Sequence, residues 1–363
     1  MSSGFTSVEV VGAGLIGTSI ALRVVKNGGA VRLLDNDPGN QRIANQLMGS
    51  SLLPNERPAE LIIAAVPVDA LPEVICGALQ SNPDSIVIDI GSVKTKVIDE
   101  VWTKLERMSL RPEFSRYLPT HPMAGRELSG PSGARSDLFE ARAWAITPHH
   151  ENGAESVAKV ADFVATMGAS GYLMSPQEHD NQVALTSHLP QILASALAGS
   201  LINWSGTLNL AGQGLRDMTR LAHSEPSVWG PIIEANGEAL APLLDLIFKS
   251  INELKDKNYN RETVLSFMEA GNTGLRRIPG KHGGVSRDYG ALSVVIPDRA
   301  GQLAALFNHC ADVEINIEDL RMEHSPGQET GLITLYVQSS DLSTLENHLS
   351  TLGWHCTIGS KNI

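Results

Sequence analysis

Short apolar runs alternate with longer segments of helical periodicity through the first half of the chain. Several runs are apolar throughout, which is typical of strands buried on both faces of a parallel sheet. Segments between them, such as residues 156–167, carry apolar residues at helical spacing. This alternation predicts a doubly wound α/β domain over residues 1–174. Its strands are expected at residues 8–11, 31–34, 61–66, 86–90, 117–120, 143–147 and 171–174.

The pattern changes after residue 174. No strand is predicted from residue 176 to about residue 277, and residues 177–203 and 226–256 each predict a long helix that follows a Ser-Pro or Ser-Glu-Pro start. Residues 239–254 are apolar on more faces than one packing surface needs, which is typical of a bundle core or a dimer interface. We expect an all-helical domain over residues 175–279 and a homodimer.

Glycine and basic residues interrupt the chain at residues 279–284, which predicts a linker over residues 280–288. A third domain is expected over residues 289–363. The order of its elements, βαββαβ, is that of a ferredoxin-like fold. These elements are predicted at residues 291–296, 301–311, 315–321, 331–337, 342–352 and 356–358.

A glycine-rich turn follows the first predicted strand directly and precedes a helix. In Gly12-Ala13-Gly14-Leu15-Ile16-Gly17, the first glycine permits the tight turn and the second lets backbone approach a pyrophosphate. The third allows the helix to pack on the strand. This context predicts a Rossmann-type dinucleotide site. The expected cofactor contacts are Gly12, Gly14, Leu15, Ile16 and Gly17.

Asp35 ends the second predicted strand, 21 residues after Gly14 and close to the spacing of a ribose-binding carboxylate. A carboxylate there accepts from a ribose 2′-hydroxyl and repels a 2′-phosphate, and Asn36-Asp37 offers no arginine to hold one. NAD is therefore favoured over NADP. The alternative is a glycine turn in a flavodoxin-like sheet with an incidental acid.

Candidate catalytic groups follow the carboxyl ends of two strands, where substrate and nicotinamide are expected to meet. Ser92 follows the strand at residues 86–90, and His121 follows the strand at residues 117–120. Removal of a hydride from an alcohol carbon requires a group that manages the hydroxyl proton, and histidine suits this near pH 7. His121 fits that role with Ser92 to orient it. The alternative is a loop histidine beside the rigid Pro122.

Two arginines give a second constellation. If their segment is helical, Arg216 and Arg220 lie four residues apart on one face and match a substrate with carboxylates. Asp217 could instead neutralise Arg220. His188, inside a helical segment, is another candidate, with a buried histidine satisfied by backbone as the alternative.

Composition narrows the function classes. The 363 residues carry 40 acidic and 28 basic side chains, a net charge of −12 that opposes nucleic-acid binding. The longest apolar runs, such as residues 61–68, fall short of the roughly 20 residues of a membrane span. Residues 1–7 lack the features of a secretory signal. Three scattered cysteines predict neither a disulfide framework nor a metal site, so a soluble, cytoplasmic protein is expected.

Six ordered motifs resemble the prephenate/arogenate dehydrogenase family of tyrosine biosynthesis. The glycine turn is followed by Asp-Ile-Gly-Ser-Val-Lys at residues 89–94 and His-Pro-Met-Ala-Gly-Arg-Glu at residues 121–127. Glu-His-Asp at residues 178–180, Ser-His-Leu-Pro at residues 187–190 and Arg-Asp-Met-Thr-Arg at residues 216–220 complete the set. The resemblance covers about residues 8–275.

The resemblance implies an oxidative decarboxylation in which a hydride passes from the ring carbinol carbon to NAD, carbon dioxide leaves and the ring becomes aromatic. His121 matches the catalytic histidine that hydrogen-bonds the ring hydroxyl, and Ser92 matches the hydroxyl that orients it. Arg220 matches the arginine that binds the ring carboxylate. His188 matches a histidine near the substrate side chain, and Glu127 matches an acid that lines the site.

The chain departs from the family pattern at two positions. Arg216 stands where members often have lysine, and Gln191 stands where many have a second histidine. Both departures lie close to the substrate side chain in the implied site, so they leave open whether that side chain is the keto acid of prephenate or the amino acid of arogenate. Prephenate is expected as the substrate, and arogenate is the alternative. A β-hydroxyacid dehydrogenase would be expected to use a helix lysine, but none occurs between Lys159 and Lys249. A nucleotide-bound amino-acid sensor is the non-enzyme alternative.

The C-terminal segment is similar to an ACT domain, a module that commonly senses amino acids. The similarity rests on Asp-Arg-Ala-Gly at residues 298–301 and Asn-Ile-Glu-Asp at residues 316–319. It implies that tyrosine or a related aromatic amino acid binds near Asp298, Gly301 and Asn316. The alternative is an ACT fold that serves only dimer contacts.

Overall fold

The computed structural model describes residues 5–49, 51–125, 130–278, 289–324 and 330–359. The chain divides into two compact units, residues 1–247 and residues 248–363. The three-domain division with boundaries near residues 174 and 279 remains a prediction. The predicted linker at residues 280–288 lies outside the described residues.

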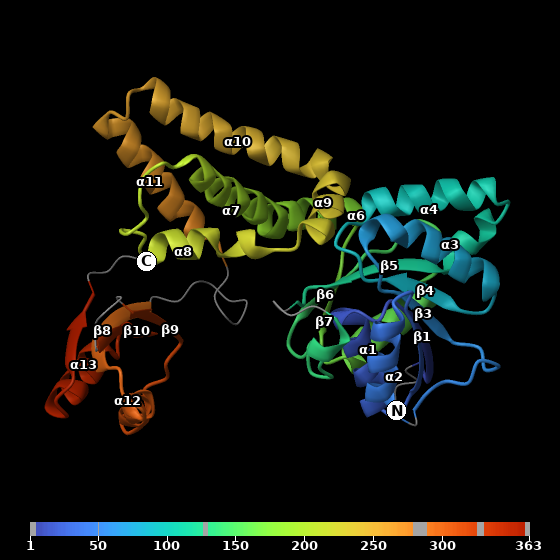
Figure 1. Cartoon of the computed structure of the whole chain (residues 1–363), viewed down its shortest axis with the longest axis horizontal. Coiled ribbons are helices and arrows are strands. Elements are labelled where there is room, and N and C mark those ends of the chain that lie inside the picture. Colours follow the sequence, from blue (N-terminus) through green and yellow to red (C-terminus); the bar gives the residue numbers. More distant parts are fainter. Residues whose placement is uncertain (1–4, 50, 126–129, 279–288, 325–329, 360–363) are drawn as a thin grey trace. The chain divides into compact units, whose positions relative to one another are not determined.

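A seven-stranded sheet organises the first unit, and every strand predicted there is present (Figure 1). The order is β2-β1-β3-β4-β5-β6-β7, with β1 pairing in parallel to both β2 and β3. An isolated parallel bridge joins Val31 to Leu52 beyond β2, where the Rossmann order has a further strand. The strands are β1 Ser7–Val11, β2 Ala30–Leu34, β3 Leu61–Ala64, β4 Ile86–Asp89, β5 Tyr117–Pro122, β6 Ala143–Ile146 and β7 Ser170–Leu173.

The far edge of this sheet departs from the predicted parallel arrangement. β6 runs antiparallel to β5, and β7 is parallel to β6. A parallel pair needs a crossover of a dozen or more residues, usually a helix. α5 (Ala154–Thr166) supplies one between β6 and β7, whereas the described residues between β5 and β6 contain only the short turn η3 (Pro131–Gly133).

Helices cover both faces of the sheet, as Figure 1 shows for α1 with α2 and for α3 with α4. Because side chains alternate along a strand, Ile63 enters the core with α1, α2 and α5, whereas Ile62 enters the core with α3 and α4. This double burial explains the continuously apolar strands. The remaining elements are α1 Leu15–Lys26, α2 Pro38–Met48, η1 Val68–Ala70, α3 Leu71–Ser81, α4 Thr95–Arg107 and η2 Arg111–Arg116.

Residues 176–278 are all described and form helices and loops. The first predicted helix is present but contains a π-turn, η4, and the second is broken at Asn236. By length and composition, Pro176–Asn203 is also the one described segment that could cross a membrane. The elements are α6 Pro176–Val183, η4 Ala184–His188, α7 Leu189–Ser200, η5 Leu201–Asn203, α8 Gln213–Thr219, η6 Arg220–His223, α9 Pro226–Ala235, α10 Gly237–Asp256 and α11 Arg261–Leu275.

The second unit contains a four-stranded antiparallel sheet of order β11-β8-β10-β9. Its elements follow the predicted βαββαβ order, but β9 begins at Asp319 rather than at residue 315. The preceding residues form a loop in which Asn316 donates to the Glu318 carboxylate. The elements are β8 Tyr289–Pro297, α12 Gln302–Ala311, β9 Asp319–His324, β10 Thr330–Gln338, α13 Leu342–Thr351 and β11 His355–Ile358.

Candidate active site

The turn between β1 and α1 has the geometry of a dinucleotide site. Gly12 has φ +113°, and a Cβ there would lie 2.1 Å from the Ala65 carbonyl oxygen. A Cβ on Gly17 would lie 2.1 Å from the Gly12 oxygen, whereas one on Gly14 would meet nothing within 4 Å. The first and third glycines are therefore required by packing. Gly14 leaves open space at the N-terminus of α1, where backbone can approach a pyrophosphate.

Asp35 follows the last residue of β2 and is tied to this turn. One carboxylate oxygen accepts from the Ala13 amide at 2.6 Å, and the other accepts from the Asp37 amide at 2.7 Å. Each carboxylate oxygen can accept more than one hydrogen bond, so a ribose hydroxyl can still bind. Leu15 and Ile16 are half-buried at the start of α1. These residues fit the adenosine and pyrophosphate of NAD.

His121 lies within β5, not in a loop beyond it as predicted. β4 stops at the pair Asp89↔Pro119, but β6 continues to pair with β5 through His121↔Ala145. The antiparallel partner therefore extends the strand and holds the His121 backbone. The His121 ring makes a hydrogen bond from Nδ1 to His179 Nε2 at 2.9 Å. Burial, reinforced by His179 and Lys94, holds the pKa of His121 well below its usual value of 6.5.

His179 and Asp180 on α6 complete a chain of polar groups. His179 Nδ1 lies 2.8 Å from Asp180 Oδ1. Asp180 also accepts from the Lys94 amide at 2.9 Å and from the Thr95 amide at 2.8 Å, so it caps the start of α4. Burial alone would raise the pKa of Asp180, but the hydrogen bonds from His179 and Thr95 outweigh burial and lower it. The carboxylate is therefore ionised at neutral pH.

A buried ion pair of Lys94 with Asp89 lies next to the strand that carries His121. Lys94 is fully buried, and its ammonium donates to Asp89 and to the Thr120 carbonyl at 2.7 Å. Asp89 also accepts from the Tyr117 hydroxyl and the Gly91 amide, both at 2.7 Å. Burial lowers the pKa of Lys94 against the opposing effect of Asp89. The cluster joins the loop after β4 to β5, the strand that carries His121.

His188 lies in the π-turn and is buried. Asn236 donates through Nδ2 to His188 Nδ1 at 3.0 Å and to the Asp180 carbonyl at 2.9 Å. Because the amide NH₂ can only donate, Nδ1 of His188 accepts and Nε2 is the protonated nitrogen. Burial lowers the pKa of His188 to about 4. The hydrogen-bond partner of His188 Nδ1 is therefore a side chain and not a backbone group. That side chain belongs to Asn236, at the break between α9 and α10.

The other predicted site residues lie in a loop, at exposed positions of the helical segment or outside the described residues. Ser92 is half-buried in the loop after β4, and Glu127 lies outside the described residues. Arg216 is exposed on α8, and Arg220 is exposed at the start of η6. Asp217 accepts from Gln213 at 2.7 Å. His188 contributes to the lowered pKa of His121, so these two histidines belong to one cluster.

Gln191 is buried, and its amide is engaged within the chain. Its carbonyl oxygen accepts from the Ser224 hydroxyl at 3.0 Å, and its nitrogen donates to the Leu221 carbonyl at 2.9 Å. These bonds attach η6, which begins at Arg220, to α7. Gln191, which stands where the family pattern often has histidine, therefore contributes to the placement of Arg220.

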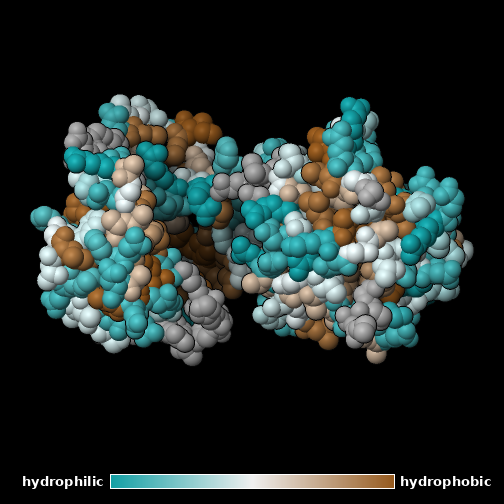
Figure 2. All heavy atoms as spheres, turned by 90° about the horizontal axis from the view of Figure 1, so that it is seen from below, coloured by the Kyte–Doolittle hydropathy of each residue, from teal (hydrophilic) through white to brown (hydrophobic). Residues whose placement is uncertain are grey.

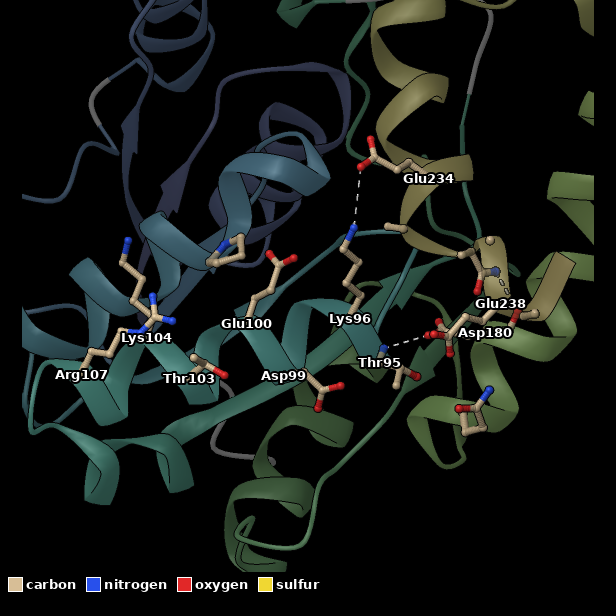
Figure 3. A pocket seen from close by; sticks show the side chains of 16 residues that line it. Thr95, Lys96, Asp99, Glu100, Thr103, Lys104, Arg107, Asp180, Glu234 and Glu238 are labelled. Carbon is tan, nitrogen blue, oxygen red and sulfur yellow. Dashed lines mark hydrogen bonds and ion pairs between the residues drawn. The ribbon is translucent and has the colours of Figure 1, made fainter. Parts of the chain in front are cut away.

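A pocket lined by residues other than His121 is shown in Figure 3. It measures about 650 Å³ between α4, α6 and the junction of α9 and α10. Lys96 on α4 reaches Glu234 at 4.0 Å across it, and Asp180 points to the Thr95 amide. A cavity of about 240 Å³ flanks His179 and is lined mainly by apolar side chains such as Met123 and Tyr172. Among the described residues, no cluster of three metal-ligating side chains occurs.

Sequence reasoning did not assign roles to His179, Asp180, Lys94, Asp89 or Asn236. The adjacent polar pair His179-Asp180, near the start of a long apolar helix, was a usable signal for a buried polar site. Asp89 and Lys94, five residues apart at a strand end, formed another. Asn236 had no such signal.

Comparisons with known proteins agree with this geometry. Residues 20–173 match the family model for the prephenate dehydrogenase nucleotide-binding domain, and residues 175–269 match that for its dimerization domain. The chain is 27% identical over 359 residues to NovF of Streptomyces niveus, described as a probable prephenate dehydrogenase; the match covers 95% of this chain and 98% of NovF. It is 31% identical over 265 residues to cyclohexadienyl dehydrogenase of Zymomonas mobilis, covering 69% of this chain and 88% of that protein.

A solved structure gives the same relationship. The prephenate dehydrogenase of A. aeolicus, crystallised with hydroxyphenyl propionate and NAD⁺, superposes with a TM-score of 0.66 and 25% identity. The superposition covers 76% of this chain and 99% of that one. The glycine turn with Asp35, the seven-stranded sheet and the family matches lead to one conclusion: the chain belongs to the prephenate dehydrogenase family of NAD-dependent dehydrogenases.

Proposed function

We propose that this chain oxidises and decarboxylates prephenate to 4-hydroxyphenylpyruvate, with His121 as the catalytic base. The observation that carries the proposal is the His121 ring, half-buried at the end of β5 and paired at Nδ1 with His179. Its lowered pKa keeps the ring neutral near pH 7, so it can accept a hydrogen bond from the ring hydroxyl. NAD, when bound at the glycine turn, accepts the hydride from the carbinol carbon.

The other residues position the substrate in this proposal. Ser92 orients the reacting group from the loop after β4, and Arg220 binds the ring carboxylate. His188 faces the substrate side chain with its protonated Nε2, and Arg216 and Glu127 line the site. Aromatisation drives the step, so the chain mainly positions its ligands and stabilises developing charge.

Parallel assays with two substrates test this function. We expect NADH production with prephenate at a kcat/KM at least about tenfold above that with arogenate, which corresponds to about 1.4 kcal/mol. Absorbance at the NADH band, recorded for both substrates at matched concentrations, measures it. A higher kcat/KM with arogenate would reassign the substrate, and no NADH with either would contradict the proposal.

Replacing Arg220 with alanine should mainly raise KM for the substrate. The substitution removes a carboxylate-binding guanidinium, and we expect KM to rise by about tenfold or more, since a charge-assisted hydrogen bond contributes about 1.5–3 kcal/mol. Initial-rate kinetics with varied prephenate measure the change, and Arg216→Ala provides the comparison on the preceding helical turn. A loss of NAD affinity with unchanged KM for prephenate would contradict the assignment.

We infer that the C-terminal sheet belongs to an ACT-like domain with a ferredoxin-like fold. We propose that an aromatic amino acid such as tyrosine binds to it near Asp298, Gly301 and Asn316. The βαββαβ element order supports it, as does Gly301, whose φ of +88° at the start of α12 favours glycine. Calorimetric titration of the whole protein with L-tyrosine should give binding heat. No heat with any aromatic amino acid would leave the ACT-like fold without this ligand.

We also propose a homodimer. The helical segment buries few residues of its own and exposes many large apolar ones. Figure 2 shows hydrophobic atoms at the surface of the chain. Light scattering should give twice the mass of the chain. The exposed side chains include Ile202, Trp204, Leu210, Met218, Leu246, Phe248, Leu265 and Met268.

We place the protein in the cytoplasm. All three cysteines are free, with Cys76 and Cys310 buried, as is usual in a reducing compartment. The helical segment Pro176–Asn203 carries the buried polar residues His179, Asp180 and His188, whose partners lie in this same unit. Cell fractionation tests this location, and recovery in the membrane fraction would contradict it.

A further inference from the structure

We propose that His179 and Asp180 are positioning residues that fix the tautomer of His121, leaving its Nε2 unprotonated to receive the substrate hydroxyl proton. This inference rests on the proposed role of His121 as the base. It concerns two residues that do not themselves touch substrate. The three side chains form a continuous hydrogen-bonded series that begins at the N-terminus of α4 and ends at His121.

The direction of each hydrogen bond follows from Asp180, the first side chain of the series. Ionised Asp180 can only accept, so His179 Nδ1 donates to it. With the His179 ring neutral, Nε2 then carries the lone pair and accepts from His121 Nδ1 at 2.9 Å. His121 is therefore protonated at Nδ1. Its remaining nitrogen, Nε2, is the acceptor that a base requires.

Asp180 is held in place by groups that cannot reorient. Its two oxygens accept from the Lys94 and Thr95 amides at the start of α4, and the Thr95 contact is drawn in Figure 3. Asn236 donates to its backbone carbonyl. A carboxylate at a helix N-terminus is stabilised as the anion. The series therefore has a fixed acceptor at one end, as in catalytic triads where a buried aspartate orients a histidine.

The titratable and charged groups around His121 favour a neutral ring before the substrate proton is transferred. His179 and His188 face it from the helical segment, and Lys94 faces it from the start of α4. Each of these groups opposes a positive charge on the resting ring. Asp180, one residue further along the series, compensates the charge that appears when the ring takes up a proton. The base is therefore neutral at rest.

The proton balance of the reaction fits this arrangement. As the carbinol carbon is oxidised, the O–H bond breaks and its proton moves to His121 Nε2. The electron pair of the bond to the departing carboxylate enters the ring, carbon dioxide leaves, and the same proton returns to the phenolate oxygen. No proton leaves the site, so the series needs only to hold a transient imidazolium.

Nitrogen NMR of the intact protein tests the tautomer directly. With ¹⁵N-labelled histidine, the His121 resonances are identified as those lost in His121→Asn. We expect a protonated Nδ1 and an unprotonated Nε2 at neutral pH. A protonated Nε2 with an unprotonated Nδ1 would overturn the proposal, whatever the activity of the protein. This measurement needs no variant at His179, so a variant that fails to fold does not affect it.

Kinetics of two variants test the consequence. We expect His179→Ala to lower kcat by about tenfold or more, a part of the contribution of a general base, with little change in KM. The acidic limb of the kcat profile should move to higher pH, because loss of His179 removes one group that lowers the pKa of His121. In His179→Gln, an amide oxygen can accept from His121 Nδ1, so kcat should recover in part.

Glu178→Gln is the matched control, since Glu178 is exposed beside His179 on α6. Its kcat and pH profile should equal those of the wild type. A kcat for His179→Ala within twofold of wild type, with an unmoved acidic limb, would overturn the positioning role. Equal losses in the Ala and Gln variants, accompanied by lost NAD binding, would assign His179 to structure alone. If His121→Asn itself retains activity, the proposed function fails instead, which separates the two hypotheses.

Discussion

His121→Asn should reduce kcat by about a hundredfold or more while leaving NAD binding nearly unchanged, since general bases contribute about 10²–10⁴. The asparagine carbonyl or amide can occupy the place of Nδ1 beside His179, but nothing replaces Nε2. The dinucleotide contacts at Gly12, Gly14 and Asp35 involve none of these atoms. Steady-state kinetics and NAD titration by fluorescence measure the two effects.

His149→Asn is the matched control for this prediction. Partial burial in the loop after β6 also lowers the pKa of His149 to about 4, and its Nε2 bonds to the Tyr117 carbonyl at 2.8 Å. It stacks on Phe114 and lies outside the proposed site. Its substitution should leave kcat within about threefold. A similarly small change for His121→Asn would remove His121 from the catalytic role.

Lys94→Met should destabilise the first unit by about 3–5 kcal/mol, because the buried Asp89 carboxylate then lacks its cation. The methionine has a similar length but donates to neither Asp89 nor the Thr120 carbonyl. The free energy of unfolding, from urea titrations of wild type and variant, gives the difference. The loop after β4 and the end of β5 should loosen together, since the cluster joins them.

Two further variants test whether the lost stability comes from the unpaired buried charge and not from the removal of a lysine as such. In the double variant Asp89→Asn with Lys94→Met no buried charge is left unpaired, so much of the lost stability should return. Lys159→Met removes an exposed lysine paired to Glu155 at 2.7 Å on α5 and should change stability by less than about 0.5–1 kcal/mol. If Lys94→Met cost no more than Lys159→Met, the buried pair would not stabilise the fold.

Net charge was a poor guide to the ligands of this chain. The value of −12 argued only against nucleic acid, yet prephenate and NAD are both anionic. Local groups offset the global charge in two ways. The open N-terminus of α1 offers backbone N–H groups to a pyrophosphate, and we propose that the exposed Arg216 and Arg220 bind carboxylates.

Local chemistry along the sequence was enough to predict the strands of the first unit and the dinucleotide turn. Continuous apolar runs mark strands buried on both faces, and the two cores on either side of β3 explain why Ile62 and Ile63 are both apolar. Gly17 is dictated by its close approach to the Gly12 carbonyl oxygen within one strand-turn-helix unit, and Asp35 lies at the end of the next strand. Such short-range features are visible without a tertiary structure.

The direction of β6, the break at Asn236 and the partners of His121 were decided only in three dimensions. His121 and His179 are 58 residues apart, and Lys94 and Asp180 are 86 apart, so their hydrogen bonds exist only once α6 docks at the start of α4. Asn236 leaves the helical pattern because its amide satisfies Asp180 and His188 in a buried site. Thus the sequence by itself determined the strands, the cofactor turn and His121 as a candidate base. The tertiary structure alone decided which buried polar groups face one another, since burial obliges each to find a partner wherever the fold brings one.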